Sequence, residues 1–223
     1  MLFPGTLLHI STYAKRKLNA ERAIQMVDVY LSPSVQQWNI GWGNYGTEEM
    51  RMNLVADVVE AELIRHGLSV ARNDPSQSLT EVVAESNQIN PTIHVAIHSN
   101  ASASGAARGP EVYVHRLGRA SEQLARDIYN RLIAISPADG LGIKEGYSAF
   151  GGQGYYELRR TKGPAVLVEV AFHDNPEDAQ FIIDNIYEIG VAIAQGILEY
   201  FNIPYQCDTP ENIAAMKAKY NGR

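Results

Sequence analysis

A carboxylate interrupts an apolar run in the last third of the chain. Glu169 lies inside Pro164–Phe172, and all the remaining residues of that run are apolar. This pattern is typical of a buried central strand. Burying an ionised carboxylate without a partner costs several kcal/mol, roughly, so such an acid is normally paired, metal-bound or held for chemistry. The run therefore predicts a functional carboxylate; the alternative is a salt-bridged core residue.

A histidine closes a second strand-like run. The segment Ile93–Asn100 is mostly apolar, and His98 lies near its C-terminal end. In open α/β sheets, ligands bind at the carboxyl edge of the strands. We therefore expect His98 and Glu169 to share a site at this edge, although a hydrogen-bonded core histidine would show the same pattern.

An acid at a helix start completes the candidate set. Thr47 is a suitable N-cap, and Glu48 and Glu49 follow in the first turn, where the helix dipole favours acids. Taken alone, Glu49 is an ordinary dipole partner. Together with His98 and Glu169 it indicates hydrolytic zinc chemistry, because such a site needs about three protein ligands and one open position. A nearby carboxylate then moves the proton of the bound water to the leaving amine.

The elements that must position these groups alternate along the chain. Strands are expected near residues 27–31, 68–72, 92–98, 110–115 and 164–172, and the main helices near 47–66, 78–86, 124–135 and 186–197. This order predicts a single α/β domain with a mostly parallel central sheet and helices on both faces. We expect residues 1–25 to be an N-terminal appendage with helical character, 26–203 the packed domain and 204–223 a C-terminal tail. The glycine-rich stretch 140–154 is expected to be a mobile surface segment.

Composition excludes several classes of protein. The chain has 223 residues, a formal net charge of −6 and a pI near 5.5, which argues against nucleic-acid binding. One cysteine, Cys207, allows no internal disulfide. No run approaches the roughly 18 apolar residues of a membrane span. The apolar N-terminus lacks the basic segment of a signal peptide, so we expect a protein that stays in the cytoplasm until release.

Two familiar catalytic motifs do not fit. Gly41–Gly46 matches G-x-G-x-x-G, but about nine residues separate it from the preceding strand, whereas a dinucleotide site needs the turn directly after the strand. Glu48 and Glu49 also place negative charge where phosphates would bind. A serine hydrolase would need G-x-S-x-G, and Gly146–Gly151 misses that spacing.

Several segments, in order and spacing, resemble the zinc-dependent N-acetylmuramoyl-L-alanine amidases, which cut peptidoglycan between the lactyl group of muramic acid and L-alanine. The similar segments are Gly46–Glu49, Ala96–Ala101, Gly142–Lys144, Leu158–Arg159 and Pro164–Asp178. The resemblance implies that Glu49 and His98 are zinc ligands and that Glu169 is the general base and acid. It also implies that Asn100 and Arg159 lie near the substrate, peptidoglycan, as in a cell-wall hydrolase or endolysin of bacterial or phage origin.

The chain departs from that family in one loop. Family members carry a histidine ligand after the first strand, but Leu31–Asn39 contains none, and Trp38, or Gln36 with a slipped register, stands in its place. Indole cannot bind zinc, and an amide oxygen is a poor substitute for imidazole. His94 lies about 13 Å from His98 along the strand. His173 is therefore the best replacement among the histidines, because it shares the parity of Glu169.

Three outcomes stay open for this site. It binds zinc through a substituted ligand set and hydrolyses amides; it binds zinc weakly and works slowly; or it has lost the metal and kept only a binding groove. In the last case the protein is a non-catalytic peptidoglycan-binding relative, with Trp38, Trp42 and Tyr45 stacking on sugar rings.

Overall fold

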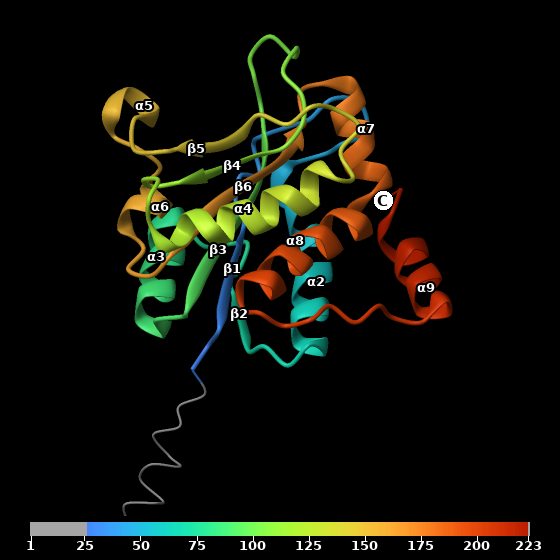
Figure 1. The fold of residues 1–223 in the computed structure, drawn as a ribbon. Helices are drawn as coiled ribbons and strands as arrows, with labels where there is room; N and C mark the ends of the chain where they lie inside the picture. Colours follow the sequence, from blue (N-terminus) through green and yellow to red (C-terminus); the bar gives the residue numbers. More distant parts are fainter. Residues whose placement is uncertain (1–25, 223) are drawn as a thin grey trace, which may run out of the picture.

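The computed structural model describes residues 26–222, and the fold is built on a six-stranded sheet (Figure 1). The strand order is β2-β1-β3-β6-β4-β5. All neighbouring strands are parallel except β4 and β6, which run antiparallel. The predicted α/β domain with a mostly parallel sheet is thus confirmed. The expectations for residues 1–25, a helical appendage without a signal peptide, lie outside the described residues.

The elements alternate as the sequence predicts. The strands are β1 Val29–Pro33, β2 Val70–Arg72, β3 Ile93–Asn100, β4 Glu111–Val114, β5 Gly142–Glu145 and β6 Ala165–Phe172. The helices are α2 Glu48–Arg65, α3 Leu79–Ile89, α4 Ala120–Ile133, α5 Ala149–Gly152, α6 Tyr156–Arg160, α7 Pro176–Asp184, α8 Ile186–Tyr200 and α9 Pro210–Tyr220.

The two faces of the sheet are covered differently. Because side chains alternate along a strand, Val95 and Ile97 of β3 join the main apolar core, to which α2, α4 and α8 contribute. Ala96 lies on the opposite face in a small apolar cluster with Leu158 of α6. His94 and His98 share this second face with Ala96, so the candidate site is on the side of the sheet covered by α3 and α6.

The start of α2 follows from its sequence. The Thr47 side chain caps the helix by accepting a hydrogen bond from the Met50 amide, as the residue types predict. Glu48 and Glu49 occupy the first turn, and Glu48 is buried. The cap fixes where the helix begins.

The glycine-rich stretch 140–154 holds more structure than expected. It contains β5, which pairs in parallel with β4, and the short α5. Lys144 of β5 forms an ion pair with Glu111 of β4. A four-residue edge strand is too short to produce a readable alternation of apolar residues, and so the sequence pattern does not reveal it.

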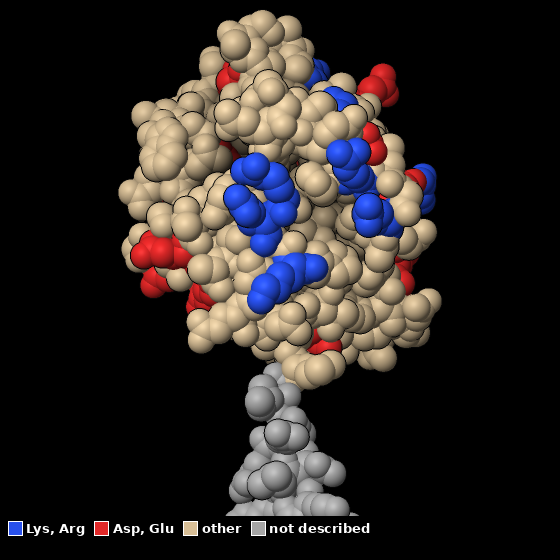
Figure 2. Space-filling view, turned by 90° about the vertical axis from the view of Figure 1, so that its left-hand side faces the viewer, with Lys and Arg blue, Asp and Glu red and all other residues tan. Residues whose placement is uncertain are grey.

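Charged side chains are unevenly spread over the surface. Figure 2 shows the face on the left of Figure 1, where Lys and Arg gather around the middle and Asp and Glu lie nearer the rim. The chain as a whole is acidic, with a formal net charge of −6. A cationic face on an acidic protein indicates a local electrostatic preference that the net charge hides.

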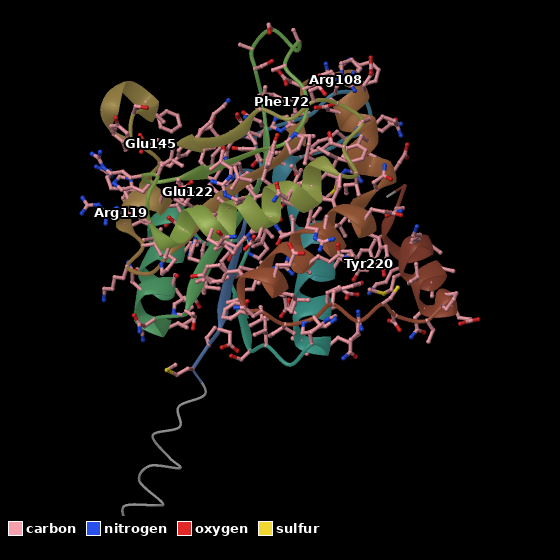
Figure 3. The ribbon with its side chains drawn as sticks, in the orientation of Figure 1. Arg108, Arg119, Glu122, Glu145, Phe172 and Tyr220 are labelled. Atoms are coloured by element: carbon pink, nitrogen blue, oxygen red, sulfur yellow. The ribbon has the colours of Figure 1, made fainter. Side chains whose placement is uncertain are left out.

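The segment after residue 203 returns to the core. Helix α9 carries Tyr220, which is buried and belongs to the main apolar core (Figure 3). Among the described residues, no single helix has the length and apolar character needed to cross a membrane; only α7 and α8 taken together do, and they meet at an 81° bend.

Candidate active site

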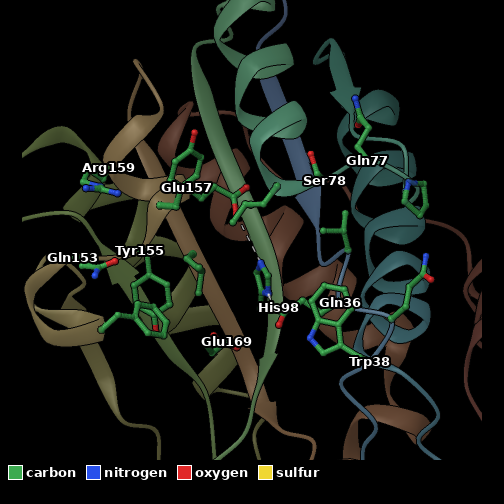
Figure 4. A pocket seen from close by; sticks show the side chains of 18 of the residues that line it. Gln36, Trp38, Gln77, Ser78, His98, Gln153, Tyr155, Glu157, Arg159 and Glu169 are labelled. Atoms are coloured by element: carbon green, nitrogen blue, oxygen red, sulfur yellow. Dashed lines mark hydrogen bonds and ion pairs between the residues drawn. The ribbon is translucent and has the colours of Figure 1, made fainter.

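The structure brings Glu169 and His98 together. They are register partners on the adjacent parallel strands β6 and β3, and both line a cavity of about 760 Å³ (Figure 4). Their shared position confirms the central expectation from the sequence, that a strand carboxylate and a strand histidine meet at one site.

Glu169 is buried, and one of its carboxylate oxygens lacks a partner within residues 26–222. The residue is 6% exposed, and its Oε2 has no hydrogen-bond partner among the described residues. Burial raises the pKa of Glu169 to about 8; the nearby His98 opposes the rise, and Glu48 and Glu111 add to it. A carboxyl group in this state exchanges a proton near neutral pH, as a general base or acid must.

His98 is held between two carboxylates. Its Nδ1 lies 2.7 Å from Oε1 of Glu48, and its Nε2 lies 3.9 Å from Oε2 of Glu157. Burial disfavours the charged ring, but the contacts with Glu157 and Glu48 outweigh it and raise the pKa of His98 well above its usual value. The ring is therefore a cation next to Glu169, in a fixed orientation.

Glu157 also binds the second histidine of β3. Its Oε1 lies 2.7 Å from Nε2 of His94, whose Nδ1 lies 2.8 Å from Oγ of Ser86 in α3. These three side chains are buried. Burial raises the pKa of Glu157, but its contacts with His94 and His98 dominate and hold that pKa far below its usual value. One carboxylate thus joins two histidines that are four residues apart on the strand.

The structure brings Glu48, rather than Glu49, to His98. Glu48 is 1% exposed and contacts the imidazole, whereas Glu49 is half-buried and its Oε1 accepts a hydrogen bond from Asn53 at 3.4 Å. Successive residues of a helix point about 100° apart, so a choice between neighbours decides which one reaches the sheet. The assignment of Glu49 as a metal ligand stays a prediction, and its neighbour is the acid in contact with His98.

Amide side chains fill the loop position that lacks a histidine. Gln36 Nε2 lies 3.5 Å from Nδ1 of His98. Asn39 Nδ2 donates to Glu48 Oε2 at 2.7 Å and to Gln36 Oε1 at 2.9 Å. Trp38 is 72% exposed and lines the cavity instead. Of the two alternatives for this position, Gln36 is the one that meets the site.

His173 does not reach the site. Its Nδ1 lies 2.9 Å from Oγ of Ser99, and its ring stacks on Tyr45. Ser99 follows His98 on β3 and therefore faces the other side of the sheet. The parity argument for His173 fails because β6 ends at Phe172 and the register of β3 and β6 shifts after His98.

The side chains at this site do not fit a zinc centre with three strong ligands. Between residues 26 and 222, no group of three or more His, Cys, Asp or Glu side chains is arranged to hold a metal ion. Glu48 and His98 bond directly to each other, and the third position offers amides. Zinc prefers imidazole, thiolate and carboxylate donors, and this arrangement does not suit it.

The two predicted substrate-binding residues lie in different settings. Arg159 is exposed and lines the cavity. Asn100 is half-buried, and its Nδ2 donates to Oε1 of Glu111. Glu111 is the register partner of Glu169 on β4. Asn100 therefore reaches the site through Glu111, and Arg159 is the more direct candidate for contact with a ligand.

Three of the residues that build the site, Glu48, Glu157 and Gln36, were not identified as site residues by sequence patterns alone. Glu157 lies in a short helical turn with no periodic signal. Glu48 carried the same helix-start signal as Glu49. The loop sequence offers Gln36 only as a possible replacement for the missing histidine. These residues lie next to the motifs in the sequence, but their contacts with His98 are visible only in the structure.

Comparison with known proteins places the chain in a family. Residues 29–199 match the family described as N-acetylmuramoyl-L-alanine amidase, and the chain belongs to that family. It is 28% identical over 181 residues to N-acetylmuramoyl-L-alanine amidase LytC of Bacillus subtilis, and the aligned region covers 78% of this chain and 35% of LytC. It is 30% identical over 125 residues to the probable cell wall amidase LytH of Staphylococcus aureus, covering 55% and 40% of the two chains. The match thus spans well under half of either relative.

Solved structures share the fold. The catalytic domain of CwlV, an N-acetylmuramoyl-L-alanine amidase from Bacillus (Paenibacillus) polymyxa var. colistinus, superposes with a TM-score of 0.71 at 24% identity, covering 80% of this chain and all of that one. The amidase AmiC2 of Nostoc punctiforme gives a TM-score of 0.70 at 23% identity, covering 79% and 98%. At these identities the structural likeness establishes the fold.

Proposed function

We propose that this protein is an N-acetylmuramoyl-L-alanine amidase that hydrolyses the amide between the muramic acid lactyl group and L-alanine in peptidoglycan. The observation that carries the proposal is Glu169, a buried carboxylate with an unpartnered oxygen, which lines an open cavity beside the charged His98. Family membership supports the substrate class.

The residues present account for the proton transfers of amide hydrolysis. Glu169 takes a proton from a water molecule, whose oxygen attacks the amide carbonyl carbon. The same carboxyl group then delivers that proton to the nitrogen of the leaving L-alanine as the carbon–nitrogen bond breaks. The cationic His98, fixed by Glu48 and Glu157, places positive charge beside the negative charge that develops on the carbonyl oxygen.

Zinc would supply further polarisation of the carbonyl and of the water in members of this family. Here the donors nearest to His98 are Glu48, Glu157 and the amide of Gln36. A zinc ion would have to displace the direct bond between Glu48 and His98. We propose that the protein binds zinc weakly at most through these residues.

The test is a variant that removes the proposed base and keeps its shape. Glu169→Gln should retain the fold and reduce the release of L-alanine N-termini from purified cell wall by at least about a hundredfold, the usual scale for loss of a general base. Glu211→Gln, an exposed acid on α9, removes the same charge far from the cavity and should match the wild type. Undiminished release by Glu169→Gln would contradict the proposal.

The alternative is a peptidoglycan-binding relative without activity, and the amides at the loop position favour it. Under that alternative, wild type and Glu169→Gln would both bind cell-wall sacculi, and neither would release new N-termini.

A further inference from the structure

Lys and Arg side chains gather on the face shown in Figure 2. In the described part of the chain, the exposed cations without a carboxylate partner include Arg116, Arg119, Arg159, Arg160 and Lys162, and Figure 3 labels Arg119 on that side of the molecule. None of them forms an ion pair within residues 26–222, whereas other cations, such as Arg72, Arg108 and Arg131, do. Arg116 packs over the ring of Tyr147 at 4.1 Å instead. In a chain with a net charge of −6, unpaired cations on one face mark a site for an anion.

We call these five residues the cationic rim, and one of them belongs to the catalytic cavity. Arg159 lines the cavity directly, and Arg160 and Lys162 follow it at the end of α6. Their backbone is tied to α3, because Asn87 donates to the carbonyl of Arg160 and accepts from the amide of Lys162. Arg119 projects at the same side of the molecule, at the start of α4 (Figure 3).

The opposite wall of the cavity has a different chemistry. Figure 4 places Trp38, Gln77 and Ser78 on one side of the cavity and Arg159 on the other. These facing residues are uncharged, and Trp38 is 72% exposed. An exposed indole with neighbouring amides and hydroxyls offers an apolar surface and neutral hydrogen bonds. The cavity therefore has a neutral wall and a wall that carries one cation, Arg159, with Glu169 and His98 between them.

The proposed substrate likewise has an uncharged part and a charged part. The lactyl carboxyl group of muramic acid is consumed in the scissile amide, so the N-acetylated sugar side is neutral, and the free carboxylates lie on the stem peptide. We propose that the cationic rim binds stem-peptide carboxylates, so that the sugar lies against the Trp38 wall and the scissile amide reaches Glu169. This inference rests on the proposed function and adds the orientation of the substrate. Arginine suits this role because its guanidinium pairs with carboxylates through two parallel hydrogen bonds.

Binding is measured in the Glu169→Gln background, so that hydrolysis does not interfere. The ligands are an N-acetylmuramyl dipeptide ending in glutamate with both carboxylates free, and the same compound with both carboxylates converted to amides. We expect the protein to prefer the free acid by about tenfold at low salt, and less at high salt because ions screen exposed charges. Adding Arg159→Gln and Arg160→Gln together should abolish the preference and leave binding of the amidated compound unchanged.

A matched control removes two positive charges elsewhere. Arg126→Gln with Lys217→Gln, both exposed and away from the cavity, should keep the tenfold preference. Retention of the preference in the Arg159/Arg160 variant would overturn the inference, as would absence of binding to either compound. Polyphosphate serves as a further probe. If the Arg159/Arg160 variant loses polyphosphate binding but binds the muramyl dipeptide as before, the rim binds a phosphate polymer and the inference is overturned. If the Glu169→Gln protein prefers the free acid while the wild type releases no L-alanine N-termini from cell wall, the rim stays in place and only the amidase function is refuted.

Discussion

Two buried carboxylates on the same face of the sheet are held in opposite ways. Glu157 bonds to His94 and contacts His98, so its pKa lies far below the usual value. Glu169, one strand away from His98, has an oxygen without a partner in the described part of the chain, and its pKa is raised to about 8. The paired acid stabilises the structure and orients a histidine. The unpaired acid costs stability and is available for proton transfer.

The largest effect should come from breaking the paired region. Glu157→Gln leaves His94 and His98 without their shared carboxylate and should lower the free energy of unfolding at pH 7 by about 3–5 kcal/mol, the scale for losing one partner of a buried pair. The folded-state pKa of Glu157 is lowered, so its stabilisation is present above the unfolded-state pKa of about 4.5 and is lost as pH falls below it.

Urea unfolding of both proteins at pH 7 and at pH 3.5 measures this difference. The difference in the free energy of unfolding between wild type and Glu157→Gln should be smaller at the lower pH. An equal gap at both values would show that Glu157 stabilises the fold by packing rather than by charge.

The unpaired region should respond in the other direction. The folded-state pKa of Glu169 is raised from 4.5 to about 8, so the cost of burying its charge appears as pH rises from about 4.5 and is complete above about 8. Glu169→Gln removes that cost and should stabilise the protein by about 1–3 kcal/mol at pH 9 and by very little at pH 4.5.

Thermal unfolding across this pH range, with Glu211→Gln as the surface control, gives the measurement. A Glu169→Gln variant that is less stable than wild type at pH 9 would mean that the carboxylate is paired in solution, and the contrast with Glu157 would disappear.

The smallest expected effect concerns metal affinity. Gln36→His restores an imidazole next to His98 and Glu48 and should tighten zinc binding by about tenfold or more, since imidazole is a far better donor than an amide. Gln37→His adds the same side chain at an exposed neighbouring position and should not change the affinity. Competition with a chromogenic chelator measures the zinc affinity of the wild type, Gln36→His and Gln37→His. Tight zinc binding by the wild type would show that Glu48 releases His98 to a metal.

Local patterns predicted much of the fold. The apolar run around Glu169, the run that ends near His98 and the Thr47 cap each fix an element over a few neighbouring residues, and the structure confirms all three. The edge strand β5 was missed because its four residues carry no readable alternation. The role of residues 204–220 was missed because Tyr220 enters the core only through contacts with distant elements.

The sequence by itself determined that a carboxylate and a histidine would lie in two mostly apolar strands, because the hydrophobicity of adjacent residues predicts which strands are buried. Only the tertiary structure decided that Glu48 and not Glu49 meets the imidazole, that Glu157 joins two histidines, and that Gln36 lies next to His98. The reason is geometric: the rotation of a helix about its axis and the position of a loop over a sheet are set by packing between segments far apart in the chain, and neighbouring residues do not encode it.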